Sequence, residues 1–407
     1  MTKSKNNKYG GIIVGIFILG AFTYQYLQYQ LSIVAPDLIG KLNLTAKQFS
    51  GIFSGPLVPA VALSIIFGII ADKLGMKVII AIAMFVSVIG GIGHIYAGSY
   101  GTMYTMMILT GFGAVAVNVT CGKMFSMWVR PELISVVMGV FLAASTVGQF
   151  VAQSTTALLG SMNTAFWISG LLCCIVFLLW VILGREKKEQ DSAMSQDIPS
   201  IGETLKVVFS SKNMWLCAIG LFLILGCQVG FNMWIPATLV SKGMSQAQAG
   251  VIASTVSLGN LCGAIIMPII AAKLGKNKPF IIVFTLICAA GYSFGWHLSG
   301  VLCYVCFFIF GLCASALMPF FISMPLSFPE IGPKYAGTAI GFISTLELLG
   351  AVVLPTYVFL PLSMTSAGMN YSRYYLVIGI GWLLAFVIGL LLPETAAKKQ
   401  LAKESAK

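Results

Sequence analysis

Two ionisable residues, Lys123 and Glu347, lie inside long apolar runs of the sequence, away from the charged connectors. A charged side chain within a bilayer is costly, so such residues are candidates for function. Glu347 lies 12 residues after Tyr335 in the run GFISTLELLGAVVLP. At about 1.5 Å per helical residue, this places it roughly 18 Å from the start of its helix, near the middle of a membrane.

Glu347 suits proton chemistry, because burial disfavours the charged form of a carboxyl group and brings proton exchange towards neutral pH. The functional interpretation is a proton-coupling acid, or a counter-charge for a cationic group of a bound molecule. The alternative is a hydrogen-bonded carboxyl group that holds two helices together. The sequence leaves both open.

Lys123 precedes Arg130 by seven residues and lies about 10 Å from the end of its helix. It could attract an anionic molecule or close an inner gate against an acid. It could equally extend its ammonium group to the nearby interface. Pairing with Glu347 would have to bridge a depth difference of about 8 Å. Asn118, on the same run, is a weaker candidate for binding.

Uncharged polar residues form two stripes at helical spacing. Tyr24, Gln28 and Ser32 are four residues apart, and so are Gln228 and Asn232. Residues at this spacing share one face of a helix. We expect Tyr24, Gln28, Gln228 and Asn232 to line a cavity, and the alternative is hydrogen bonding between helices.

The composition indicates a polytopic membrane protein. The chain has 407 residues, of which 58% are hydrophobic and 9% charged, and its mean hydropathy is +0.95. A soluble domain carries about 25% charged residues. The first apolar run is too long for a cleaved signal segment. Runs of about 20 residues or more can span a bilayer, and they fall near 10–35, 50–71, 78–98, 101–128, 133–158, 164–184, 214–240, 247–271, 279–298, 300–325, 335–361 and 373–392.

The basic residues predict the orientation of these twelve spans. With the N-terminus inside, 19 of the 24 lysines and arginines fall in inner connectors or tails and four in outer ones. This bias follows the positive-inside rule and predicts a multi-pass protein of the cell inner membrane with both termini cytoplasmic. The formal charge of +12 is spread over short connectors, so we expect no nucleic-acid partner.

The chain repeats itself after about 200 residues. This shift aligns Gln28 with Gln228 and Lys73 with Lys273. The predicted parts are an N-terminal six-helix half, a cytoplasmic linker that includes a short helix from Ile201, a C-terminal six-helix half and a cytoplasmic tail. Their residues are 1–184, 185–212, 213–394 and 395–407.

The connector GIIADKLGMK combines glycines, one acid and two bases in a fixed order. It resembles the signature loop of the major facilitator superfamily of secondary transporters, which has a Gly, three residues, Asp, a base, one residue, Gly and a base. The matching residues are Gly68, Asp72, Lys73, Gly75 and Lys77. In the second copy Ala272 stands where Asp72 does, while Lys273 and Gly275 are kept. We therefore expect this motif to act in gating.

Other segments resemble the organic-anion branches of that superfamily, among them the anion:cation symporters, the organophosphate antiporters and the cyanate- and oxalate-type permeases. These segments are QLSIVAP, CGKMFSMW, WVRPE, FNMWIPATL and PEIGPKYAGTAIG. The chain departs from the pattern of those branches where Gln28 replaces an arginine of the first helix. Met107 likewise replaces the arginine of the general helix 4 motif.

The resemblance implies an all-α fold of twelve transmembrane helices in two pseudo-symmetric halves, working by alternating access. We expect a small organic anion such as a carboxylate as substrate, in symport or exchange and coupled to protons through Glu347. The alternatives are efflux of hydrophobic or cationic compounds and a transporter-like membrane sensor. The sequence has no catalytic pair, metal-ligand set or nucleotide motif, so we expect no enzyme activity and no cofactor. The expected partners are the substrate, protons and lipid, and the expected state is a monomer.

Overall fold

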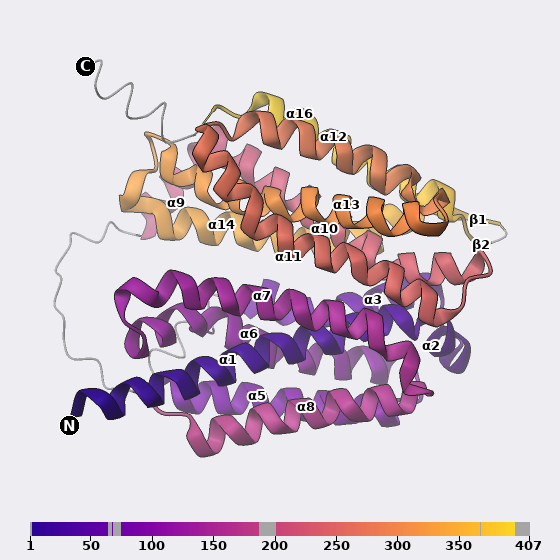
Figure 1. Ribbon diagram of the computed structural model, residues 1–407, viewed down its shortest axis with the longest axis horizontal. Helices are drawn as coiled ribbons and strands as arrows, with labels where there is room; N and C mark the ends of the chain where they lie inside the picture. Colours follow the sequence, from indigo (N-terminus) through magenta and orange to yellow (C-terminus); the bar gives the residue numbers. More distant parts are fainter. Residues whose placement is uncertain (1, 64–66, 68–74, 187–200, 367, 395–407) are drawn as a thin grey trace. The chain divides into compact units, whose positions relative to one another are not determined.

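The computed structural model describes residues 2–63, 67, 75–186, 201–366 and 368–394. The chain forms two compact helical units, and in each the long helices run side by side (Figure 1). Unit 1 comprises Met1–Ser192 and Leu239–Ser254, and unit 2 comprises Ala193–Thr238 and Thr255–Lys407.

Unit 1 begins with a long helix and continues through shorter segments into four further long helices. Its helices are α1 (Thr2–Ile33), α2 (Ala35–Leu42), α3 (Ala46–Ser54), α5 (Met76–Gly93), α6 (Tyr100–Trp128), α7 (Pro131–Thr155) and α8 (Met162–Leu183), with 3₁₀ turns η1 (Gly55–Leu57), η2 (His94–Tyr96) and η3 (Thr156–Leu159). Phe17 of α1 packs against Phe125 and Trp180, with ring centroids 5.6 and 5.7 Å away. These contacts join α1 to α6 and α8.

Unit 2 follows the same plan after one short helix. Its elements are α9 (Ile201–Ser210), α10 (Lys212–Ser241), α11 (Gln246–Leu274), α12 (Lys278–Phe294), η4 (Gly295–His297), α13 (Gly300–Ser323), η5 (Met324–Ser327), α14 (Gly332–Val353), the π-helical η6 (Leu354–Phe359), α15 (Leu360–Ser363), strands β1 (Met364–Thr365) and β2 (Gly368–Met369), and α16 (Tyr371–Leu391). Phe231 of α10 packs on Tyr292, Phe307 and Tyr375. The antiparallel pair β1–β2 forms the turn before α16.

Eleven spans in the described part of the chain are long and apolar enough to cross a membrane. They coincide with eleven of the twelve predicted runs. The remaining run, 50–71, includes residues outside the described set. The short helix predicted from Ile201 is present as α9.

Several features recur at the 200-residue shift. Thr45 and Gln48 exchange side-chain to backbone hydrogen bonds before α3, and Ser245 and Gln248 do the same before α11. A side chain on Gly111 would collide with the carbonyl of Pro56, and one on Gly311 with that of Val256. These shared caps and close contacts support the prediction that both halves follow one plan.

The compact units differ from the predicted halves at one segment. Leu239–Ser254, which includes the start of α11, groups with unit 1. Gln246 Nε2 donates to the carbonyl of Ile33 at 2.6 Å and to Asp37 Oδ2 at 3.2 Å. Gly250 lies against the carbonyl of Gln153. These contacts explain the grouping, and the predicted boundaries themselves stay a prediction.

Candidate functional site

The polar stripe of α1 is engaged inside unit 1. Tyr24 Oη lies 3.0 Å from Ser87 Oγ of α5, and Gln28 Nε2 donates to the carbonyl of Phe53 in α3 at 3.1 Å. Both side chains are buried. These are the interhelical hydrogen bonds that the sequence offered as the alternative to cavity lining. Substrate contact by Tyr24 and Gln28 stays a prediction.

The matching stripe of α10, Gln228 and Asn232, keeps polar atoms that have no hydrogen-bond partner among the described residues. Asn232 Nδ2 donates to the carbonyl of Gln228 at 2.9 Å, but Gln228 Nε2 and Asn232 Oδ1 have no hydrogen-bond partner among the described residues. The side chains are 8% and 2% exposed. A buried polar group without a partner costs about 1–3 kcal/mol. A donor and an acceptor one helical turn apart are therefore available to water or to a polar ligand.

Glu347 lies on α14, which packs closely against α10. Gly350 meets the carbonyl of Phe222, and Gly226 meets Leu354 and the carbonyl of Gly350. Glu347 precedes Gly350 by three residues, about 60° around the helix from the α10-facing side. It is half-buried, and its carboxylate has no hydrogen bond or ion pair to any residue that the structure describes.

Seven residues after Glu347 the helix changes to a π turn, η6, which contains Pro355. Such turns are frequent at functional sites in helical proteins. The sequence analysis missed this feature. Pro355 is the one sequence signal for it, because proline lacks the amide hydrogen that an α-helix would use there.

Asn118 and Lys123 both lie on α6 in unit 1. Asn118 Nδ2 donates to the carbonyl of Ala114 at 2.8 Å and its side chain is exposed, whereas Lys123 is half-buried. Their separation of five residues places them about 140° apart around the helix, so they do not share one face. Pairing of Lys123 with Glu347 would join the two units and stays a prediction.

The motif assigned to gating is only partly described. Gly68, Asp72 and Lys73 lie outside the described residues. Gly75 precedes α5 with a φ of 87°, a conformation that favours glycine. Lys77 lies in the first turn of α5.

Glu186, which the sequence analysis had counted only as part of the linker, caps the start of α5. Its carboxylate oxygens accept hydrogen bonds from the backbone amides of Met76 and Lys77 at 3.0 and 3.2 Å. Glu394 repeats this arrangement in unit 2. It accepts from Asn277 and Lys278 at 2.9 and 3.2 Å, at the start of α12. An acid just after the last long helix of each half was the available signal.

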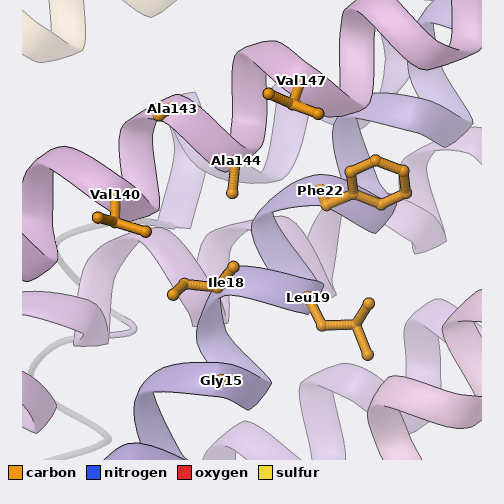
Figure 2. A pocket seen from close by; sticks show the side chains of 8 residues that line it. All are labelled: Gly15, Ile18, Leu19, Phe22, Val140, Ala143, Ala144 and Val147. Carbon is orange, nitrogen blue, oxygen red and sulfur yellow. The ribbon is translucent and has the colours of Figure 1, made fainter.

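An apolar groove of about 610 Å³ lies between α1 and α7 in unit 1. Figure 2 shows the residues that line it, which are Gly15, Ile18, Leu19, Phe22, Val140, Ala143, Ala144 and Val147. Tyr24 follows Phe22 by two residues, about 200° around α1, so it lies on the opposite side of the helix. This groove offers no polar side chain and suits only apolar groups.

The described residues contain no group of three or more histidine, cysteine or acidic side chains that could hold a metal ion. The ten cysteines are free.

Comparison with known proteins adds to this geometry. The profile of the Major Facilitator Superfamily matches residues 16–355. The sialic acid transporter NanX of Escherichia coli strain K12 is 23% identical over 414 residues, which cover 95% of this chain and 94% of that protein. The hexuronate transporter of Bacillus subtilis strain 168 is 26% identical over 253 residues, 59% of each chain. The crystal structure of a D-xylose-proton symporter is similar with a TM-score of 0.72 and 16% identity, covering 95% of this chain and 99% of that one.

Proposed function

This chain belongs to the Major Facilitator Superfamily, and on that premise we propose that it is a secondary active transporter of a small hydroxylated organic anion, of the sugar-acid type. The family and its transporter fold account for the paired units of long apolar helices. The substrate class and the coupling to protons are our proposal.

The observation that carries the proposal is the buried amide pair of α10. Gln228 Nε2 is a free donor and Asn232 Oδ1 a free acceptor among the described residues. A carboxylate oxygen would accept from the first, and a hydroxyl group would donate to the second. A molecule that carries both groups would complete the hydrogen bonding of this face.

The relatives agree with this chemistry. Those compared above are named for hexuronate and for sialic acid, which both combine a carboxylate with several hydroxyl groups. In our proposal Lys123 adds a positive charge that attracts the anion. Asn118, Tyr24 and Gln28 remain candidates for further contacts.

Glu347 supplies the proton coupling in this proposal. Its carboxylate has no partner among the described residues, and its helix, α14, packs against α10. Protonation of a carboxyl group at this depth would neutralise a charge that the membrane disfavours. Coupled movement of anion and proton would then carry no net charge.

Uptake by the purified protein in proteoliposomes tests the proposal. Labelled glucuronate and sialic acid should enter saturably, faster when the outside is more acidic, and a protonophore should remove the acceleration. Glucose, which lacks the carboxylate, is the matched control and should not compete. Strong competition by organic cations with none by carboxylates would refute the proposal.

Export of apolar or cationic compounds is the second candidate. The groove between α1 and α7 favours it, because apolar side chains line that groove throughout. The same proteoliposomes, loaded with a lipophilic cationic dye, provide the test. This candidate would be favoured if a proton gradient drove movement of the dye and the protein transported no carboxylate.

A further inference from the structure

We propose that the connector between α11 and α12 binds one anionic glycerophospholipid, with its phosphate at Lys273 and Lys276 and one acyl chain along α12. This inference is independent of the transported substrate. It concerns the face of unit 2 that the distribution of basic residues predicts to be cytoplasmic.

Two cavities meet at this connector. One, of about 650 Å³, includes Gly275, Lys276, Lys278 and Glu394 in its lining. The other, of about 390 Å³, is lined by Leu274, Lys276, Pro279, Phe280, Val283 and Phe284. Both include Lys276, Pro279 and Val283. A polar mouth therefore continues into an apolar slot along the first two turns of α12.

The other charged groups at the mouth are already engaged. Glu394 accepts hydrogen bonds from the backbone amides of Asn277 and Lys278. Lys278 Nζ donates to the carbonyls of Leu390 and Leu392 at 2.6 and 2.8 Å. These hydrogen bonds connect the start of α12 to the chain at the end of α16. They engage the carboxylate of Glu394 and the ammonium group of Lys278.

Two lysines remain: Lys276, which lines both cavities, and Lys273, which lies three residues earlier in the last turn of α11. Both are exposed, and neither makes a hydrogen bond or ion pair within the part of the chain that the structure describes. In the first copy of the repeat the connector carries Asp72, but here Ala272 takes that position. Without that acid, nothing in the connector between Ala271 and Asn277 opposes an anion.

A lipid fits this combination better than a free anion does. Basic pockets beside transmembrane helices on the cytoplasmic side are typical sites for anionic head groups. The slot along Phe280, Val283 and Phe284 would be needless for inorganic phosphate. Its residues lie within a helix that is long and apolar enough to cross a membrane, where an acyl chain would be at hand.

Native mass spectrometry of the full-length protein, titrated with phosphatidylglycerol and with phosphatidylcholine, tests the site. We expect one tightly held phosphatidylglycerol and no comparable phosphatidylcholine. Changing both lysines, Lys273→Gln and Lys276→Gln, should weaken retention about 30-fold. Val283→Trp, which keeps both lysines and fills the slot, should also weaken it.

The matched control removes two lysines from the same predicted face, Lys206→Gln and Lys212→Gln, and should leave retention unchanged. An equal loss in this control would refute the site, since general attraction to basic residues would then suffice. Equal binding of phosphatidylcholine would refute the role of the charge. Full competition by glycerol phosphate or inorganic phosphate would show a soluble anion site and would overturn the lipid assignment.

Discussion

Gln28 and Gln228 occupy matching positions in the two copies of the repeat, but the two side chains are used differently. Gln28 donates to the carbonyl of Phe53 inside unit 1. Gln228 lies one turn before Asn232 and its donor has no partner in the described residues of unit 2. The same residue type thus links two helices in one copy and keeps a buried donor without a described partner in the other.

The helix ends differ much less between the copies. Glu186 and Glu394 each cap the start of a long helix with two backbone hydrogen bonds. The comparison teaches that the shared plan is kept at the helix ends and at the close contacts of Gly111 and Gly311, while the polar stripes of α1 and α10 have diverged. Function is therefore to be sought where the copies disagree.

The largest effect is expected for Gln228→Leu. Losing a hydrogen bond to a charged ligand costs about 1.5–3 kcal/mol, so the substrate affinity should fall about 10- to 100-fold. Gln28→Leu is the matched comparison. It should lower the thermal stability and should weaken substrate binding much less than Gln228→Leu does, because Gln28 already donates to the carbonyl of Phe53. Calorimetric titration measures the substrate affinity of each variant. Equal losses of affinity in the two variants would contradict the proposed difference between Gln28 and Gln228.

Glu347→Gln should remove the driving force without removing exchange. Uphill uptake should fall to the level of vesicles treated with a protonophore, because the amide cannot carry a proton. Exchange of labelled for unlabelled substrate across the vesicle membrane should persist. Glu330→Gln, which changes a carboxylate bonded to Ser211 near the start of α10, should keep full coupling. Full gradient-driven uptake by Glu347→Gln would exclude the proposed role.

Asp72→Asn tests the role of the acid that the first copy carries and that Ala272 replaces in the second. We expect it to slow transport about fivefold, equivalent to about 1 kcal/mol in the barrier, with nearly unchanged affinity. Initial rates at saturating substrate, together with binding measurements, separate the two quantities. A large loss of affinity would instead place Asp72 in contact with the substrate.

The smallest effects are expected at the caps. Glu186→Gln and Glu394→Gln should each cost about 1 kcal/mol, a fall in Tm of about 2–4 °C. The double variant should show the sum, since the caps lie in separate units. Thermal unfolding in detergent gives all three values. A markedly larger loss for one variant would show that the two caps are not equivalent.

Much of the fold was predictable because length and apolarity alone define a span. Local patterns predict eleven of the described spans and the helix α9. The partners of Tyr24 and Gln28 were not predictable, because α1 is apolar around most of its circumference and its sequence does not say which side meets α3 and α5. The capping role of Glu186 could not be predicted for another reason, because its partners lie about 110 residues earlier in the chain.

The candidate site could be foreseen only as a set of residue types. Depth in a helix singled out Glu347, and spacing singled out Gln228 and Asn232. Which amides already have partners depends on neighbouring backbones, such as the carbonyl of Phe53, that no local pattern encodes. The π turn at Pro355 is similar, because a proline indicates a break in a helix but not its kind.

The two glutamate caps bear on how the protein could be assembled from pieces. Each cap ties the end of a unit's last long helix to the start of an earlier helix in the same unit. A cut in the backbone between residues 187 and 200 would leave both caps intact. Two separately translated fragments would each retain their own hydrogen bonds at these helix ends. The second fragment would supply Leu239–Ser254 to the first in trans, where Gln246 can again donate to Ile33.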